Sequence, residues 1–154
     1  MTLYSVAPPQ APEDASKLAA TLENVGAGRK PPARILVVED EWLVACEIEA
    51  ALADEGLEVV GIAASAEEAL QMAEVHMPEL VLMDIRIRGN GDGIYAALEI
   101  SRRFGLRSLF VSANDDPGTR ERAQAAHPLG WLPKPFSTMQ LVSAVEEALR
   151  GLRP

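Results

Sequence analysis

The chain has 154 residues, a formal net charge of −9 and hydrophobic residues at 48% of its positions. This length excludes a multi-domain enzyme and is enough for one domain with a hydrophobic core, while the acidic balance argues against nucleic acid as a direct partner. No apolar run is long enough to span a membrane, the N-terminus lacks the pattern of a secretory signal, and a single cysteine, Cys46, excludes an internal disulfide. We therefore expect a small cytoplasmic domain.

Residues 1–33 differ in composition from the rest of the chain. Five of the eleven prolines fall in this segment, and its acidic and basic side chains cancel. We expect a disordered tail, with one short helix as the alternative because Leu18, Leu22 and Val25 repeat at helical spacing. The folded domain is predicted to span residues 34–151.

Beyond the tail, short apolar runs alternate with segments of helical periodicity. The runs are of strand length and are rich in branched side chains, as is typical of buried strands. The predicted strands are 35–38, 59–62, 80–83, 109–111 and 130–133. Apolar stripes at helical spacing follow them, over 44–52, 66–73, 94–101, 119–126 and 141–149.

Polar residues at the starts of three of these helices support the assignment. Ser65 with Glu68, and Ser137 with Gln140, have the spacing of a capping box, in which each side chain accepts a backbone hydrogen bond of the other residue. Asp116 precedes a proline, the pattern of an N-cap followed by the first helical residue. Five βα units with short loops predict a parallel sheet covered by helices on both faces.

Ligands bind such sheets beyond the carboxyl ends of the strands, and polar residues occupy those positions here. Glu39 and Asp40 follow the first predicted strand, Asp84 follows the third, Ser112 the fourth and Lys134 the fifth. Because parallel strands end at one edge of the sheet, we expect the five side chains to meet in one pocket.

The chemistry of this set points to a metal and a phosphoryl group. Crowded carboxylates repel one another unless a cation lies between them, and Mg²⁺ suits oxygen ligands. Asp84 can then act as a nucleophile on phosphorus, with Ser112 and Lys134 binding the phosphoryl oxygens. Taken singly, an acid or a serine after a strand is an ordinary turn residue. However, Lys134 is the only lysine in residues 34–154, which contain ten arginines. This exception, and the placement of all five residues after strands, favour the site.

Five stretches carry a family resemblance: ILVVEDE, LVLMDIRI, NGDGI, LFVSAN and GWLPKPF, in this order. In a chain of five βα units they resemble the receiver domain of two-component response regulators, over residues 34–151. The resemblance implies a doubly wound, flavodoxin-like (βα)5 sandwich. Its five parallel strands, numbered along the chain, would lie in the order 2-1-3-4-5.

The resemblance also implies roles for the residues at the acidic end of the pocket. Asp84 matches the phosphoacceptor, which receives its phosphoryl group from a histidine kinase or a His-containing phosphotransfer protein. Asp40 matches the direct Mg²⁺ ligand, and Glu39 matches the neighbouring acid, expected to act through water. Arg86 matches the position whose backbone carbonyl completes the metal shell.

The remaining roles concern the switch that reports phosphorylation. Ser112 matches the switch hydroxyl, Trp131 the switch aromatic and Lys134 the invariant lysine, whose bond to Pro135 is usually cis. The segment 88–93 departs from the common receiver pattern, so the lifetime of the phosphoryl group is not predicted.

The sequence therefore favours a phosphorylation-dependent signalling switch that catalyses its own phosphorylation and dephosphorylation but is not otherwise an enzyme. Because few residues follow the last predicted helix, we expect a stand-alone receiver that signals by contact with a protein. The predicted contact is a downstream target or a second copy, reached through the face built by segments 117–126, 130–133 and 138–149. We expect no direct contact with nucleic acid or membrane.

Two alternatives remain. A phosphorylation-independent adaptor could keep the same fold, although the presence of Asp84 and Lys134 argues against it. A small-molecule phosphatase or phosphotransferase could use an aspartyl phosphate, but such enzymes normally carry a second carboxylate two residues after the nucleophile, where this chain has Arg86.

Overall fold

The computed structural model describes Gly28 and residues 30–154, so nearly all of the predicted tail, residues 1–33, lies outside the described residues. Strands and helices alternate along the described part. The strands are β1 (Arg34–Val38), β2 (Glu58–Ala63), β3 (Leu80–Met83), β4 (Ser108–Ser112) and β5 (Gly130–Pro133). The helices are α2 (Trp42–Asp54), α3 (Ala66–His76), α4 (Gly93–Phe104), α5 (Pro117–Ala123), the 3₁₀ turn η1 (Gln124–Ala126) and α6 (Thr138–Gly151).

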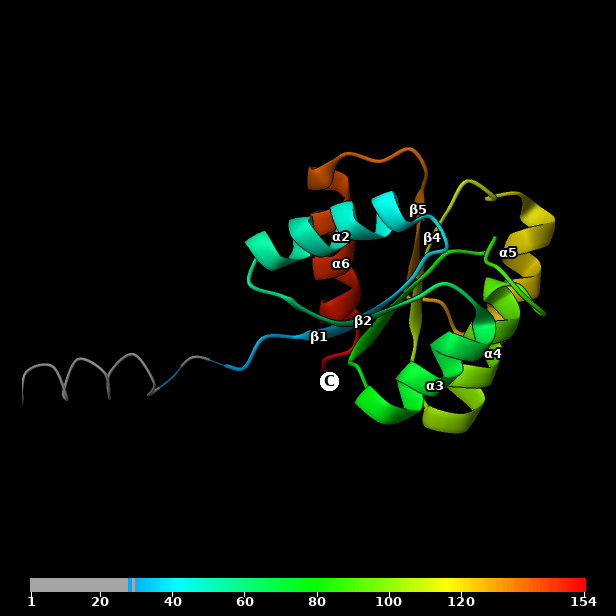
Figure 1. Cartoon of the computed structure of the whole chain (residues 1–154), viewed down its shortest axis with the longest axis horizontal. Coiled ribbons are helices and arrows are strands. Elements are labelled where there is room, and N and C mark those ends of the chain that lie inside the picture. Colours follow the sequence, from blue (N-terminus) through cyan, green and yellow to red (C-terminus); the bar gives the residue numbers. More distant parts are fainter. Residues whose placement is uncertain (1–27, 29) are drawn as a thin grey trace, which may run out of the picture. The chain divides into compact units, whose positions relative to one another are not determined.

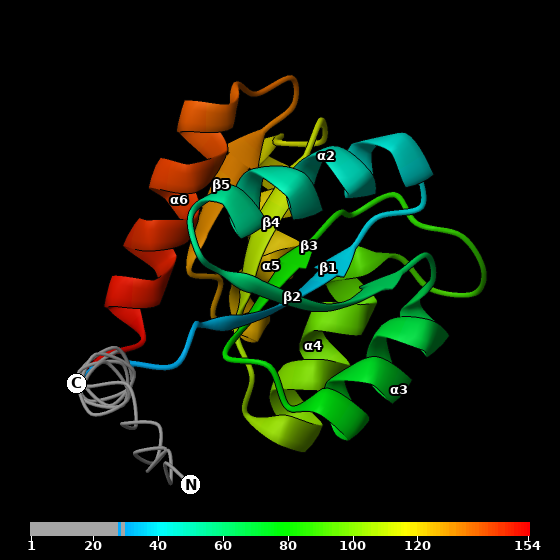
Figure 2. The same cartoon turned by 60° about the vertical axis from the view of Figure 1, so that its left-hand side comes forward.

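The five strands form one parallel sheet in the order β2-β1-β3-β4-β5. Helices α2 and α6 cover one face, and α3, α4 and α5 cover the other (Figures 1 and 2). The predicted doubly wound fold and strand order are therefore confirmed. Chain order reverses at β1, which lies between β2 and β3, so the carboxyl ends of β1 and β3 flank the switch point of the sheet.

The two faces of the sheet have separate cores of different composition. Beneath α3, α4, α5 and η1, seven of the nine buried hydrophobic residues of the helices are alanine. Beneath α2 and α6, two of seven are alanine, and the others are the larger Ile48, Leu52, Leu141, Val145 and Leu149. The helices over the second face therefore bury mostly branched side chains, and those over the first bury mostly alanine.

Three predicted helix starts can be compared with the structure. Ser137 and Gln140 form the complete capping box, with N···O distances of 3.1 and 2.8 Å. Asp116 caps α5 through the Thr119 N–H at 3.0 Å. Ser65 accepts from the Glu68 N–H at 3.2 Å, but the Glu68 carboxylate accepts from the Ala64 N–H at 2.9 Å. The capping box predicted there is therefore incomplete, because the Glu68 carboxylate binds the N–H of Ala64 and not that of Ser65.

The segment predicted as one helical stripe over residues 119–126 is divided. α5 has seven residues and passes into the 3₁₀ turn, although Ala123 and Ala126 are both buried as their spacing predicts. Among residues 30–154, none of the helices has the length and apolar character that crossing a bilayer requires.

Candidate functional site

The site begins with two acids that the sheet backbone holds in place. The Glu39 N–H donates to the Ala63 carbonyl at 2.9 Å, and the Asp84 N–H donates to the Val38 carbonyl at 3.0 Å. Both residues directly follow their strands, and only 3% of Glu39 and 6% of Asp84 is exposed. Because β1 and β3 are neighbours, their carboxyl ends bring the two acids to one edge of the sheet.

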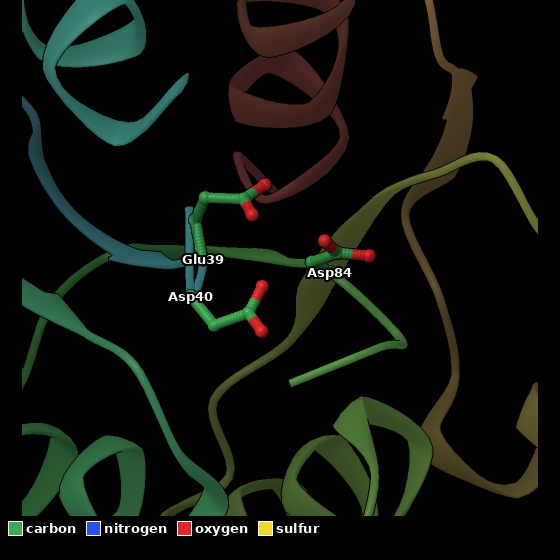
Figure 3. Close-up of side chains that lie close together, drawn as sticks. All are labelled: Glu39, Asp40 and Asp84. Atoms are coloured by element: carbon green, nitrogen blue, oxygen red, sulfur yellow. The ribbon is translucent and has the colours of Figure 1, made fainter. Parts of the chain in front are cut away.

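Asp40 completes a cluster of three carboxylates. Glu39, Asp40 and Asp84 each offer an oxygen, and these oxygens all lie within 4.8 Å of one another. Figure 3 shows the three side chains gathered beyond the ends of the strands. Opposite ligands of an octahedral Mg²⁺ lie about 4.2 Å apart, so the spacing and the all-oxygen donor set fit this ion. The structure thus brings together three of the predicted metal ligands.

Lys134 reaches the cluster from the end of β5. Its Nζ lies 2.5 Å from Glu39 Oε2 and 2.9 Å from Asp84 Oδ2. Its backbone N–H donates to the Ser112 carbonyl at 3.1 Å, and its bond to Pro135 is cis, as the resemblance implies. The ammonium group therefore compensates two buried acids at once.

The pKa values in the cluster follow from burial and charge. Burial is the largest influence on Glu39; with the negative charge of Asp84 it raises the Glu39 pKa, despite the opposing hydrogen bond from Lys134. For Lys134, burial acts to lower the pKa, but hydrogen bonds to Glu39 and Asp84 outweigh it and raise the pKa above its ordinary value. Without a metal, the pocket therefore disfavours ionisation of Glu39 and favours the charged form of Lys134.

Ser112 and Arg86 lie beside the cluster. Ser112 is the last residue of β4, is buried, and its Oγ accepts from the Asn114 N–H at 3.2 Å. Within the described part of the chain, no hydrogen bond joins Ser112 to Asp84. Arg86 is exposed and its backbone N–H donates to Asp84 Oδ1 at 3.3 Å. The expected roles of the Ser112 hydroxyl and the Arg86 carbonyl stay predictions.

Trp131 contacts both an aromatic ring and a guanidinium group. Its indole stacks on Phe110, with 4.6 Å between ring centroids and 20° between planes, and the Arg120 guanidinium carbon lies 5.1 Å from the indole centroid. Arg120 in turn binds Asp115 through two hydrogen bonds. Sequence reasoning missed Arg120, because its contact with Trp131 depends on how the short helix α5 is placed.

The segment 88–93 connects the cluster to α4. Asp92 caps this helix through the Tyr95 N–H at 2.9 Å and also accepts from Arg122 at 2.8 Å. Burial acts to raise the Asp92 pKa, but these two hydrogen bonds and the Arg122 charge lower it below the ordinary value. The next residue, Gly93, packs directly on the backbone of Asp84. This loop is therefore tied both to α5 and to the buried acid.

The arrangement can support one chemistry in particular. A buried carboxylate, Asp84, lies beside two further acids, with which it suits a divalent cation, and contacts an ammonium group. A carboxylate in such a setting can attack an electrophilic phosphorus, because the surrounding positive charges can offset the negative charges of the phosphoryl oxygens.

Comparison with known proteins shows the family of this chain. The family model of the response regulator receiver domain matches residues 35–146. The transcriptional regulatory protein PdtaR of Mycobacterium tuberculosis is 38% identical over 122 residues, covering 79% of this chain and 59% of that protein. The phyllosphere-induced regulator PhyR of Methylorubrum extorquens is 31% identical over 117 residues, 75% of this chain and 43% of that protein. The chain thus spans about half the length of these relatives.

Solved structures give the same result. The signal receiver domain of a modulated diguanylate cyclase from Desulfovibrio desulfuricans superposes with a TM-score of 0.72 at 30% identity, covering 79% of this chain and 96% of that one. A CheY-like receiver domain protein from Methanospirillum hungatei has a TM-score of 0.73 at 25% identity, with the same coverage.

Proposed function

Since the chain belongs to the family of response regulator receiver domains, which gives it a role in two-component signalling, we propose that it is a phosphorylation-dependent switch with Asp84 as the phosphoacceptor. The observation that carries this proposal is the position of Asp84. Its carboxylate is buried, lies within 4.8 Å of the Glu39 and Asp40 oxygens, and is 2.9 Å from the Lys134 ammonium. Glu39 shares the burial and the contact with Lys134, so the choice of Asp84 rests in addition on its match to the acceptor position of the receiver family.

The proposed reaction transfers a phosphoryl group from a phosphohistidine. An Asp84 oxygen forms a bond to phosphorus as the phosphorus–nitrogen bond of the donor breaks, and the imidazole leaves with a proton taken from solvent. Asp40, Asp84, the Arg86 carbonyl and, through water, Glu39 would hold Mg²⁺. When bound, the ion would offset negative charge on the phosphoryl oxygens. Hydrolysis of the product by water, aided by the same residues, would reset the switch.

Lys134 and Ser112 respond to the new group. Phosphorylation adds about −1.5 to −2 charges and three acceptor oxygens. Lys134 already contacts an Asp84 oxygen, so its ammonium needs only a small movement to bind the phosphoryl group. Ser112 would exchange its bond with the Asn114 N–H for one to a phosphoryl oxygen, which would draw the loop 113–116 toward Asp84.

The implied partners follow from this chemistry. The phosphodonor is a histidine kinase or a His-containing phosphotransfer protein in the cytoplasm, and the output is contact with a protein target or a second copy through the α5–β5–α6 face. Catalysis is confined to the chain's own phosphorylation and dephosphorylation.

A labelling experiment tests the proposal. Wild-type protein with Mg²⁺ should be phosphorylated by acetyl phosphate and by at least one member of a panel of kinases from the same genome. Asp84→Asn removes the nucleophilic oxygen and should abolish labelling, whereas Asp54→Asn, an exposed acid at the end of α2, should label normally. Failure of the wild type to accept phosphate from any donor would instead favour the adaptor, and wild-type labelling of Asp84→Asn would reject the acceptor assignment.

A further inference from the structure

Arg120 joins two parts of the molecule that the switch must connect. It lies in the first turns of α5, and its guanidinium forms a forked pair with Asp115, with 2.9 Å between Nη2 and Oδ2. Asp115 lies three residues after Ser112, in the loop that ends at the N-cap of α5. The same guanidinium lies over the indole of Trp131 on β5. One side chain therefore touches both the loop and the aromatic residue.

The indole contacts two groups. Phe110, fully buried on β4, pairs in register with Trp131 and stacks on its ring, and the Arg120 guanidinium also lies over the indole. Trp131 is only partly buried, so the arginine shields a ring that would otherwise face solvent more fully. A planar guanidinium suits this task because it can stack on an aromatic face while its edge binds a carboxylate.

We propose that Arg120 is a positioning residue that holds Trp131 against Phe110 in the unphosphorylated chain and couples the indole to movement of the loop 113–116. This inference rests on, and deepens, the proposed function. When Ser112 is drawn toward a phosphoryl group, Asp115 moves with the loop. Arg120 then either follows Asp115 or loses the forked pair, and in both cases its stacking on Trp131 changes.

The contacts of Arg120 with Asp115 and Trp131, together called the clasp, set the size of the expected effect. Exposed ion pairs and exposed cation–π contacts each change an equilibrium by about twofold to fivefold. Because the clasp stabilises the unphosphorylated arrangement, Arg120→Gln should accept phosphate from acetyl phosphate about two- to fivefold faster than wild type. The Arg120→Lys variant keeps the charge but not the forked pair, and should fall between the two.

The chain offers a matched control on the same helix. Arg122, two residues further, is also an exposed arginine in an ion pair, but its partner is Asp92 rather than Asp115. The chain has two tryptophans, so Trp42→Phe leaves Trp131 as the only source of indole emission. In this background and without phosphate, Arg120→Gln should shift the emission of Trp131 to longer wavelength and increase its quenching by acrylamide, while Arg122→Gln should leave both unchanged.

Two further comparisons separate the clasp from simple loss of a charge. Asp115→Asn should produce part of the Arg120→Gln shift, and the double variant should shift no further than Arg120→Gln alone, because both changes break one interaction. At equal phosphorylation, measured by phosphate-affinity gel, the change in Trp131 emission should be smaller in Arg120→Gln than in its parent.

Equal behaviour of Arg120→Gln and Arg122→Gln in emission, quenching and labelling rate would overturn the proposal. If wild type accepts no phosphate, the proposed function fails and the coupling fails with it, whereas the emission comparison without phosphate still decides whether Arg120 holds the indole. A normal labelling rate with an unchanged phosphorylation response in Arg120→Gln would reject the coupling alone.

Discussion

Gly93 and Asp84 are in such close contact that a β-carbon on Gly93 would lie 1.8 Å from the carbonyl oxygen of Asp84. The Gly93 N–H also donates to the Ile85 carbonyl at 2.8 Å. The first residue of α4 is thus pressed against the backbone of the proposed phosphoacceptor. Since a backbone carbonyl cannot rotate away as a side chain can, this contact fixes where α4 begins relative to Asp84.

Gly93→Ala should therefore destabilise the domain and displace Asp84. We expect a loss of about 1–3 kcal/mol in the free energy of unfolding, the usual cost of overpacking, measured by urea denaturation. Gly151→Ala is the control, because a β-carbon there would meet only Leu129, at an ordinary 3.7 Å. Equal stability of Gly93→Ala and wild type would show that α4 can shift freely away from the acid.

Mg²⁺ should stabilise the folded chain. The three clustered carboxylates are brought together only by folding, so the ion binds the native state and raises its stability by mass action. At ten times the dissociation constant the gain is about 1.4 kcal/mol, or roughly 5 °C in the melting temperature for a domain of this size. Identical melting curves in Mg²⁺ and in chelator would count against the metal site. Asp40→Asn should lose most of the gain.

Removing the ammonium group should have the opposite effect in the absence of metal. Lys134→Ala leaves Glu39 and Asp84 buried without their shared partner, which should cost about 1–3 kcal/mol in chelator. The variant should therefore gain more from Mg²⁺ than wild type does, because the ion replaces part of the lost positive charge. Thermal melts of both proteins with and without Mg²⁺ measure this difference, and an equal gain would mean that Lys134 does not compensate the metal ligands.

Glu39 should make stability depend on pH when no metal is bound. The Glu39 pKa is raised above its ordinary 4.5, so in the window above that value the folded state holds the proton more tightly than the unfolded state. The Glu39 contribution to stability should then fall as the pH rises through this window. In chelator, the stability of wild type relative to Glu39→Gln should decrease from pH 4.5 toward neutrality. A difference that grows with pH would contradict the direction of the shift.

The sequence predicted most of the fold because the signals are local. Short apolar runs such as 80–83 and a capping pair such as Ser137 with Gln140 depend on neighbouring residues, and both appear as expected. The meeting of Asp84 with Lys134, 50 residues apart, was predictable because parallel strands end at one edge. The partners of Arg120 and Arg122 were not, because they depend on the rotation of a seven-residue helix that few side chains anchor.

The uneven composition of the two cores has a mechanical consequence. Alanine has no side-chain rotamers to rearrange, so helices that meet the sheet through alanines can slide in shear without repacking their contacts. The fully buried residues of α3, α5 and η1 are all alanine, whereas α4 also buries Ile94 and Ile100, and the branched residues of α2 and α6 resist sliding. A small displacement of the loops around Asp84 should therefore spread into the layer of α3, α4 and α5 and stop at the sheet. We therefore expect α5, which is short and buries only alanine, to be displaced more easily than α2 or α6.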